Sequence, residues 1–428
     1  MPTPRSEAEG YAVKLNAPKV PRAAAVAEVD GCFEGSLDGI AREGARRMLQ
    51  AALVAEADEF VARHVGVVDE HGRRQIVRNG YLPQRDLLTG AGRLTLDAPR
   101  VRDKRRGGDG VSFTSAILPR YLRRSKALDE LIPWLYLRGI STGAMQDALT
   151  ALLGDNAPAL SANVVVKLTG QWRDEFESWR KRDLSQEEYV YLWADGIYCN
   201  VRLEEERQCL LVLIGATKDG RKELVAVQDG LRESEQDWLA LLTDLKRRGL
   251  RKPPQVAVGD GALGFWAALH KAFPTTKTQR CWVHKAANVL SKLPRHSHGA
   301  ARKALEAIWN AGTKKEAQKA VLAFKEAFGA KHPKAVECVL KDQVELLAFY
   351  DFPAEHWLHL RTTNPIESTF ATVRLRHDKT KGNGTAAATL AMVFKLAQLA
   401  AKGWRKLNGY AQLVQLLAGR KFVDGIAA

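Results

Sequence analysis

Apolar residues recur at helical spacing from Leu37 to about His64, and this period predicts one long amphipathic helix. The pattern then changes at about residue 72. Residues 72–126 are rich in Arg, Gly and Pro, and their short apolar runs predict strands and turns that end in an arginine-rich stretch.

Three further helices are predicted at 126–139, 141–154 and 161–182, with Ser141 and Ser161 as N-caps of the second and third. Short helices separated by Gly-containing turns are typical of a helix-turn-helix unit. The same spacing also fits an ordinary helical bundle, and periodicity alone leaves both interpretations open.

From Tyr189 the period changes from helix to strand. Segments 189–202, 208–220 and 222–230 are strand-like and joined by short charged turns, which predicts two antiparallel hairpins. Helices and strands then alternate, with strands predicted at 255–260 and 276–284. This order predicts a mixed sheet in an α/β domain.

Residues 296–349 carry only helical periodicity, rich in Ala and Lys, and we interpret them as a helical insertion. A helix is predicted to start near Asn364, and a last amphipathic helix at 389–407.

Charge changes this picture in one respect. Sixty-five Lys and Arg face forty-nine Asp and Glu, a formal charge of +16, which favours a polyanionic partner such as nucleic acid. Residues 100–126 hold nine Lys or Arg against two Asp. With 46% hydrophobic residues the chain is long enough to bury a core, and its length predicts two or three domains.

The N-terminal segment has no apolar run typical of a signal peptide, and no stretch of about 18 apolar residues is present to span a bilayer. We therefore expect a cytoplasmic, nucleoid-associated protein without a membrane partner. The five cysteines are sparse and form no CxxC pair, so reduced thiols are expected.

Two aspartates stand out chemically. Asp195 lies within an apolar strand, where a carboxylate is costly unless a cation compensates it, and Asp260 ends the predicted strand at 255–260. Carboxylates that hold two divalent cations about 4 Å apart are what phosphoryl transfer on DNA requires. The ordinary alternatives are a turn or strand-edge aspartate for Asp195 and a helix N-cap for Asp260.

Glu367 is the candidate third carboxylate. It lies three residues after Asn364, with Pro365 between them, so a capping box explains it equally well. Arg374 follows two helical turns later and would project from the same face, either to clamp a phosphate or as part of a solvated basic surface.

The segments YLWADGIY, VAVGDGALGFW, QRCWVHK and LRTTNPIESTFATVRLR resemble the Mutator-type bacterial insertion-sequence transposases, and the match runs in order from about residue 80 to the C-terminal helix. This resemblance implies a DDE catalytic domain of ribonuclease H-like fold, split by a helical insertion. It places the catalytic, metal-ligating triad on Asp195, Asp260 and Glu367, with two Mg²⁺ or Mn²⁺ ions as cofactors.

The family's Cys-x2-His signature falls on Cys281 and His284, expected on the strand and turn after Asp260. No second Cys/His pair at zinc-finger spacing accompanies them, so they are expected to support the active site, although His284 also fits a purely structural role. Transposases of related fold use an aromatic residue of the insertion to stabilise distorted DNA. Trp309 is the candidate here, and its alternative is a core tryptophan.

The resemblance implies an enzyme that binds the terminal inverted repeats of its element, cuts DNA and joins the freed 3′ end to target DNA, acting as a homodimer on double-stranded DNA. A nuclease or resolvase of the same fold, and a non-catalytic DNA-binding regulator, are the alternatives. We expect an N-terminal helical region at 1–70, a DNA-binding region at 71–185, a catalytic domain at 186–295 and 350–428, and the insertion at 296–349. The expected DNA contacts besides Trp309 are Arg100, Arg102, Lys104, Arg105, Arg106, Arg120, Arg123 and Arg124.

Overall fold

A computed structural model describes residues 36–105, 110–140, 144–153, 162–201, 207–261, 263–380 and 385–428. The predicted caps Ser141 and Ser161 and the basic residue Arg106 lie outside this part of the chain. The described residues form two compact units, one from residues 36–86 and 94–120, the other from residues 87–93 and from 121 onward.

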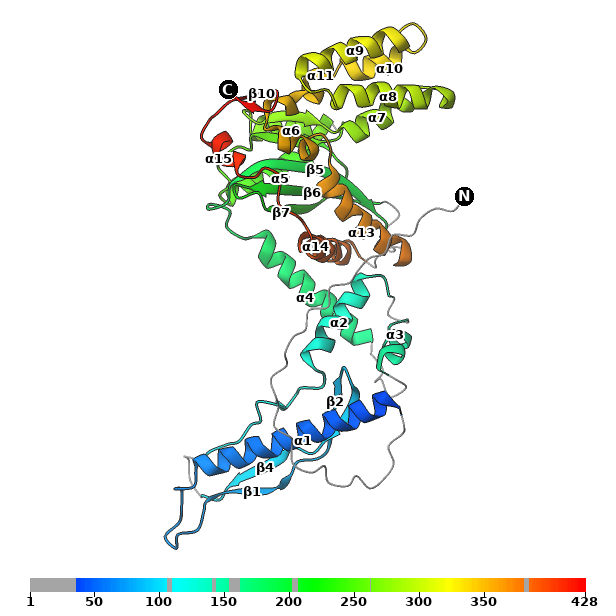
Figure 1. Cartoon of the computed structure of the whole chain (residues 1–428). Coiled ribbons are helices and arrows are strands. Elements are labelled where there is room, and N and C mark those ends of the chain that lie inside the picture. The colour runs from blue at the N-terminus through cyan, green and yellow to red at the C-terminus, as the bar shows by residue number, and fades with distance from the viewer. Residues whose placement is uncertain are drawn as a thin grey trace, which may run out of the picture. The chain divides into compact units, whose positions relative to one another are not determined.

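The long helix predicted at the start of the first unit is α1 (Leu37–Arg63). Ser36 caps it, its hydroxyl accepting a hydrogen bond from the Gly39 N–H at 3.1 Å. Strands β1 (Ile76–Tyr81) and β4 (Pro99–Asp103) pair antiparallel, and both pack against α1 (Figure 1). The strands and turns expected after residue 72 are therefore confirmed.

Strands β2 (Arg85–Thr89) and β3 (Gly92–Leu96) form a hairpin between β1 and β4. In the second unit, Leu88 packs with residues of α2 (Lys126–Leu137) and α3 (Ala144–Leu153), two of the three predicted helices. This small core is separate from the two that cover the main sheet.

The third predicted helix is α4 (Ala162–Arg180). Its Trp172 and Phe176 are buried in the same core as the main sheet, and the Phe176 ring lies 5.3 Å from that of Phe394. The second half of α4 is thus built into the sheet-bearing unit.

The main sheet has five strands in the order β7-β6-β5-β8-β9. Strands β5, β6 and β7 are antiparallel to one another in succession, whereas β8 runs parallel to β5 and β9 runs parallel to β8. The mixed sheet predicted from the sequence is confirmed. The strands are β5 (Tyr189–Cys199), β6 (Gln208–Thr217), β7 (Lys222–Gly230), β8 (Val256–Gly259) and β9 (Lys277–Arg280).

Both faces of this sheet are covered, because alternate residues of β5 enter different cores. Tyr191 and Trp193 belong to the core on one face, and Leu192 and Ala194 to the core on the other. Helices α5 (Glu235–Arg247) and α6 (Leu263–Ala272) cover the second face. The first face packs against α7 (Trp282–Leu290), α13 (Asn364–Thr380) and α14 (Ala386–Ala401). A carboxylate on β5 is therefore held in largely apolar surroundings.

Between 296 and 349 the chain forms helices joined by short turns, as predicted, and α8 (His298–Trp309), α9 (Lys314–Phe328) and α10 (Pro333–Leu340) pack in sequence next to α7 (Figure 1). The chain closes with α15 and a two-stranded ribbon, which the sequence analysis did not predict. The remaining elements are the 3₁₀ turns Arg295–Ser297, Ala348–Asp351 and Ala354–His356, and α11 (Gln343–Leu346), α12 (Trp357–Leu360), α15 (Gln412–Leu417), β10 (Phe422–Val423) and β11 (Ile426–Ala427).

Within the described residues, no helix is both long enough and apolar enough to cross a membrane. The four cysteines in this part of the chain are free thiols and all are buried: Cys199, Cys209, Cys281 and Cys338.

Candidate active site

The two aspartates singled out in the sequence lie at matching positions of neighbouring parallel strands. Trp193 on β5 is the register partner of Val258 on β8, and Asp195 and Asp260 each follow two residues later. Asp195 is partly buried, and its Oδ1 accepts a hydrogen bond from the Gly196 N–H at 2.9 Å. The sheet itself therefore brings these carboxylates together.

A third carboxylate, Glu233, joins them from the turn between β7 and α5, and the sequence analysis missed it. One carboxylate oxygen from each of Asp195, Glu233 and Asp260 lies within 4.8 Å of the others. Glu233 packs directly over Gly196, where an added Cβ would fall 2.5 Å from its Oε1. Glycine at this position leaves room for the Glu233 side chain to reach the cluster.

Burial and the neighbouring negative charges raise the pKa values of two of these carboxylates. Burial raises the pKa of Asp195 to about 6, with Asp260 and Glu367 adding to the rise and His284 opposing it. Burial raises the pKa of Glu233 to about 7, and Asp260 and Asp195 contribute in the same direction. Like charges in a poorly solvated site favour a compensating cation.

Cys281 and His284 lie on α7 rather than on a strand and turn, which corrects the sequence prediction. Strand β9 ends at Arg280, Cys281 occupies the N-cap position of α7, and His284 lies in the first helical turn. The helix begins this early because Trp282 and Val289 are buried with helical spacing on its inner face.

The thiol and the imidazole influence each other. A hydrogen bond with Cys281 raises the pKa of His284 to about 9, and the charges of Cys281, Asp195 and Asp260 act in the same direction against burial. Although burial alone would raise the pKa of Cys281, hydrogen bonds from His284 and Thr363 lower it. His284 is thus a cationic neighbour of the aspartates.

Glu367 enters the site from α13. Its Oε1 accepts a hydrogen bond of 2.9 Å from the Thr363 hydroxyl, and the hydroxyl and N–H of Thr363 each lie 3.4 Å from the Cys281 sulfur. One ligand atom each of Glu367, Cys281 and His284 lies within 4.8 Å of the others. Thr363, fully buried, is a second residue that the sequence analysis missed.

The capping box proposed as the alternative for Glu367 is not formed as expected. The helix begins at Asn364, so Thr363 takes the cap position and its carbonyl accepts hydrogen bonds from the N–H groups of Ile366 and Glu367. The Glu367 carboxylate contacts the Thr363 hydroxyl instead of an N-cap backbone N–H. The hydrogen bond with Thr363, together with the start of α13, therefore fixes the position of the Glu367 carboxylate.

Electrostatic interactions link the group of Asp195, Glu233 and Asp260 to the group of Cys281, His284 and Glu367, because His284 interacts with Asp195 and Asp260, and Asp195 interacts with Glu367. The structure thus places Asp195 and Asp260 in one group and Glu367 in the other. It adds Glu233 as a fourth acidic residue and Thr363 as the link between Glu367 and Cys281.

Arg374 and Trp309 lie outside this cluster. The Arg374 side chain is exposed on α13, 5.9 Å from the centre of the Phe370 ring. The partly buried Trp309 ring packs against Trp282, with 5.2 Å between ring centroids, and the Trp309 carbonyl accepts a hydrogen bond from Arg361. Much of the Trp309 ring is thus used in packing within the core. The proposed phosphate contact of Arg374 and DNA contact of Trp309 stay predictions.

The predicted basic surface has a regular basis in β4. On β1, Ile76 is buried and Arg78 pairs with Asp58 of α1, so both side chains face α1. Arg102 on β4 is the register partner of Val77, which lies between them, and therefore points away from α1. The side chains of Arg100, Arg102 and Lys104 are exposed and follow each other at every second position, which makes them a row of positive charges.

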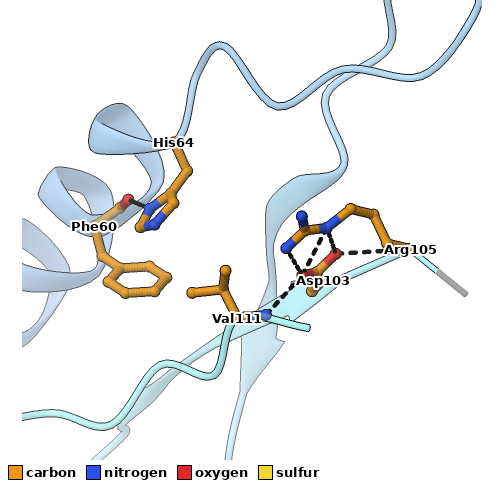
Figure 2. A network of polar contacts seen from close by, with 5 residues as sticks. All are labelled: Phe60, His64, Asp103, Arg105 and Val111. Carbon is orange, nitrogen blue, oxygen red and sulfur yellow. Dashed lines mark hydrogen bonds and ion pairs between the residues drawn. The ribbon is translucent and has the colours of Figure 1, made fainter. Parts of the chain in front are cut away.

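Asp103 organises the end of this strand (Figure 2). It forms an ion pair of 2.6 Å with Arg105 and accepts a hydrogen bond of 2.9 Å from the Val111 N–H. These contacts, led by the Arg105 hydrogen bond, lower the pKa of Asp103. Nearby, His64 Nδ1 lies 2.8 Å from the Phe60 carbonyl at the end of α1 (Figure 2).

In the second unit, Arg123 is exposed and Arg124 forms an ion pair of 2.9 Å with Asp129. Arg120, at the end of the first unit, is exposed as well. All the described basic candidates are therefore exposed, except Arg124, which is half-buried.

A mixed α/β fold that clusters carboxylates from two adjacent parallel strands is the arrangement expected of an enzyme that acts through acidic side chains. Comparison with known proteins identifies the class further. A family model described as "Transposase, Mutator family" matches residues 22–406. The chain belongs to this family of transposases.

Similar curated proteins agree with this assignment. The chain is 53% identical over 298 residues to the transposase for insertion sequence element IS6120 of Mycolicibacterium smegmatis, covering 70% of this chain and 92% of that protein. It is 49% identical over 284 residues to the transposase for IST2 of Acidithiobacillus ferrooxidans, covering 66% and 96%. A match of 28% identity to the transposase for ISRM5 of Rhizobium meliloti spans 90% of this chain and 93% of that protein.

Proposed function

We propose that this transposase binds the terminal inverted repeats of an insertion sequence and catalyses DNA cleavage and strand transfer with Asp195, Asp260 and Glu367. The observation that carries the proposal is the register of Asp195 and Asp260 on adjacent parallel strands, and the electrostatic interaction between Asp195 and Glu367 supports it. The strand order β7-β6-β5-β8-β9 supports a ribonuclease H-like catalytic domain at 186–295 and 350–428, with 296–349 as its helical insertion.

The donor set fits divalent metal ions. Carboxylate oxygens are hard ligands of the kind that Mg²⁺ and Mn²⁺ prefer, and three of them lie within 4.8 Å of one another. Asp195 interacts with Asp260, Glu233 and Glu367, so these carboxylates are the residues that would hold the ions. Bound there, divalent ions would activate the attacking oxygen and stabilise the leaving one.

The protein's own residues complete the site. The sheet fixes Asp195 and Asp260, while Thr363 orients Glu367 through its hydroxyl. His284, cationic at neutral pH, lies where it can hold a phosphate oxygen or donate a hydrogen bond to it. No covalent enzyme intermediate is needed, because the freed 3′ hydroxyl attacks the target phosphodiester in the same site.

DNA recognition is assigned to the region 71–185. The exposed row Arg100, Arg102 and Lys104 would contact phosphates, and base contacts would supply the specificity. Since both ends of an element must be held together for transposition, we propose that the chain acts as a homodimer on double-stranded DNA.

The test is a cleavage and strand-transfer assay on a duplex bearing the element's own end. Asp195→Asn, Asp260→Asn and Glu367→Gln should each abolish both reactions with Mg²⁺ or Mn²⁺ while leaving end binding nearly unchanged. Calcium should permit binding but little chemistry, since its looser coordination fits the transition state poorly. Full activity in chelator would contradict the metal mechanism.

The same assay separates the alternatives. Cleavage without joining of a pre-cut end would indicate a nuclease or resolvase. Repression by binding that survives Asp195→Asn, in a chain that never cuts, would indicate a non-catalytic regulator.

A further inference from the structure

A hollow of about 500 Å³ lies in the second unit, away from the carboxylate cluster. Its walls come from the end of α4, the middle of the edge strand β7 and the last turn of α5. The basic residues among its lining are Arg180, Lys181, Arg247 and Arg248, and the one acidic residue is Asp244. The lining therefore carries an excess of positive charge.

Arg248 is the central observation. Its side chain is only 10% exposed, and its Nε forms an ion pair of 2.8 Å with Asp244. Among the described residues, its buried Nη1 has no hydrogen-bond acceptor. Arg248 also lines the hollow, so its guanidinium, fixed by Asp244 through Nε, is a positive charge held in place beside any anionic ligand there.

One carboxylate, Asp244, faces two arginines and leaves a net positive charge. Asp244 is shared, because its other oxygen pairs with Arg247 at 2.6 Å. Arg182 lies 4.2 Å from the Trp179 ring, and donates to the carbonyls of Leu224 and Val225. Arg180 and Lys181 pair with Glu177 at 2.9 and 3.9 Å, but both side chains are largely exposed.

We infer that this hollow binds a phosphate of the DNA backbone, as a second DNA contact distinct from both the carboxylate cluster and the β4 row. The inference rests on the proposed function, since it takes DNA as the substrate. Helix α5 starts beside Glu233 and ends at the hollow; its 13 residues span about 20 Å. This distance corresponds to about six base pairs, so one duplex can reach both places.

The inference is tested with the full-length chain and a fluorescent duplex, by measuring affinity as a function of salt concentration. Lys181→Gln and Arg247→Gln change largely exposed side chains, and Arg248→Gln removes the buried donor. Arg251→Gln is the matched control, because it removes the same charge from the exposed segment just after α5 without lining the hollow.

Each hollow variant should weaken binding to all sequences alike and reduce the salt slope by about one. A fourfold rise in salt should then cost each variant about 3.5-fold less affinity than it costs the unmodified chain. The control should change the slope much less. Thermal unfolding of Arg248→Gln, together with the two exposed variants, separates the removal of a phosphate contact from a folding defect.

Failure of this inference is distinguishable from failure of the proposed function. If the unmodified chain binds no DNA, the proposed function fails. If it binds DNA but the salt slopes of Lys181→Gln and Arg247→Gln match that of Arg251→Gln, only the hollow is excluded as a DNA contact. Selective loss of binding to an acidic polypeptide, with DNA binding unchanged, would also overturn the inference and indicate a protein partner.

Discussion

The carboxylates of Asp195, on β5, and Glu233, on the turn after β7, meet over Gly196. Strand β6 lies between β5 and β7 in the sheet, so the turn after β7 must bring Glu233 back toward β5. The contact makes Glu233 part of the same acidic cluster as Asp195 and Asp260. From this placement we predict a role for Glu233 in the reaction.

Glu233→Gln should lower the rate of end cleavage by at least about tenfold and raise the Mg²⁺ concentration needed for half-maximal activity, because it removes a charged oxygen next to the proposed ligands. Glu235→Gln is the control: it lies two residues away and pairs with Lys271 at 2.5 Å outside the cluster. Equal activity and equal metal requirement in the two variants would show that Glu233 has no part in the reaction.

Thr363→Val should reduce cleavage about 10- to 100-fold, because Glu367 and Cys281 lose the hydroxyl that links them while side-chain volume is kept. Thr363→Ser retains the hydroxyl and should restore most of the activity. The Mg²⁺ dependence is the decisive measurement, since a merely destabilised fold would not change it. A normal metal requirement in Thr363→Val would mean that Thr363 only packs.

The pH dependence of stability follows from the raised pKa values of Asp195 and Glu233, about 6 and 7. A carboxyl whose pKa is higher in the folded chain stabilises it while protonated, and this contribution is lost as pH rises through the folded value. Without divalent metal, the free energy of unfolding should therefore fall between about pH 5 and 8.

Glu233→Gln should flatten this dependence and stabilise the metal-free chain at pH 8 by about 1 kcal/mol, allowing for partial solvent screening. Denaturant titrations at pH 5, 6, 7 and 8 measure both effects. Mg²⁺ should recover stability at pH 8 in the unmodified chain more than in the variant. A variant that is less stable than the unmodified chain at pH 8 would contradict the assigned crowding.

Neutralising Arg100 and Arg102 together should lower DNA affinity for all sequences and reduce the salt slope by about two, one for each phosphate that is no longer neutralised. Arg46→Gln with Arg47→Gln is a suitable control, because these residues of α1 pair with Glu43 at 2.8 and 2.6 Å. If both double variants show the same slope as the unmodified chain, the β4 row does not contact DNA.

Much of the secondary structure followed from periodicity. The long helix at the start, the three antiparallel strands and the helical stretch at 296–349 all have strong, regular patterns, and the structure contains them. Periodicity failed at Cys281, where a short strand meets a helix and no Gly or Pro marks the boundary. It also missed the C-terminal ribbon, whose strands are two residues long.

The site was predictable only in part. Asp195 and Asp260 could be placed together only by analogy, because the first and fourth strands are neighbours in a ribonuclease H-like strand order. Glu233 could not, since an acidic residue just before Ser234, the N-cap of α5, has an ordinary explanation in the helix start. Thr363 has no local signal at all: its importance arises from contacts with Cys281, 82 positions away.

Glu367 can join the site only late in protein synthesis. Its helix, α13, packs against β5, and the next helix, α14, packs against α4. These contacts join segments far apart in the sequence, so they form only after nearly the whole polypeptide has left the ribosome. A chain that ends anywhere before α13 contains Asp195 and Asp260 but lacks Glu367. A nonsense mutation even shortly before Asn364 should therefore abolish transposition as fully as the loss of Asp195.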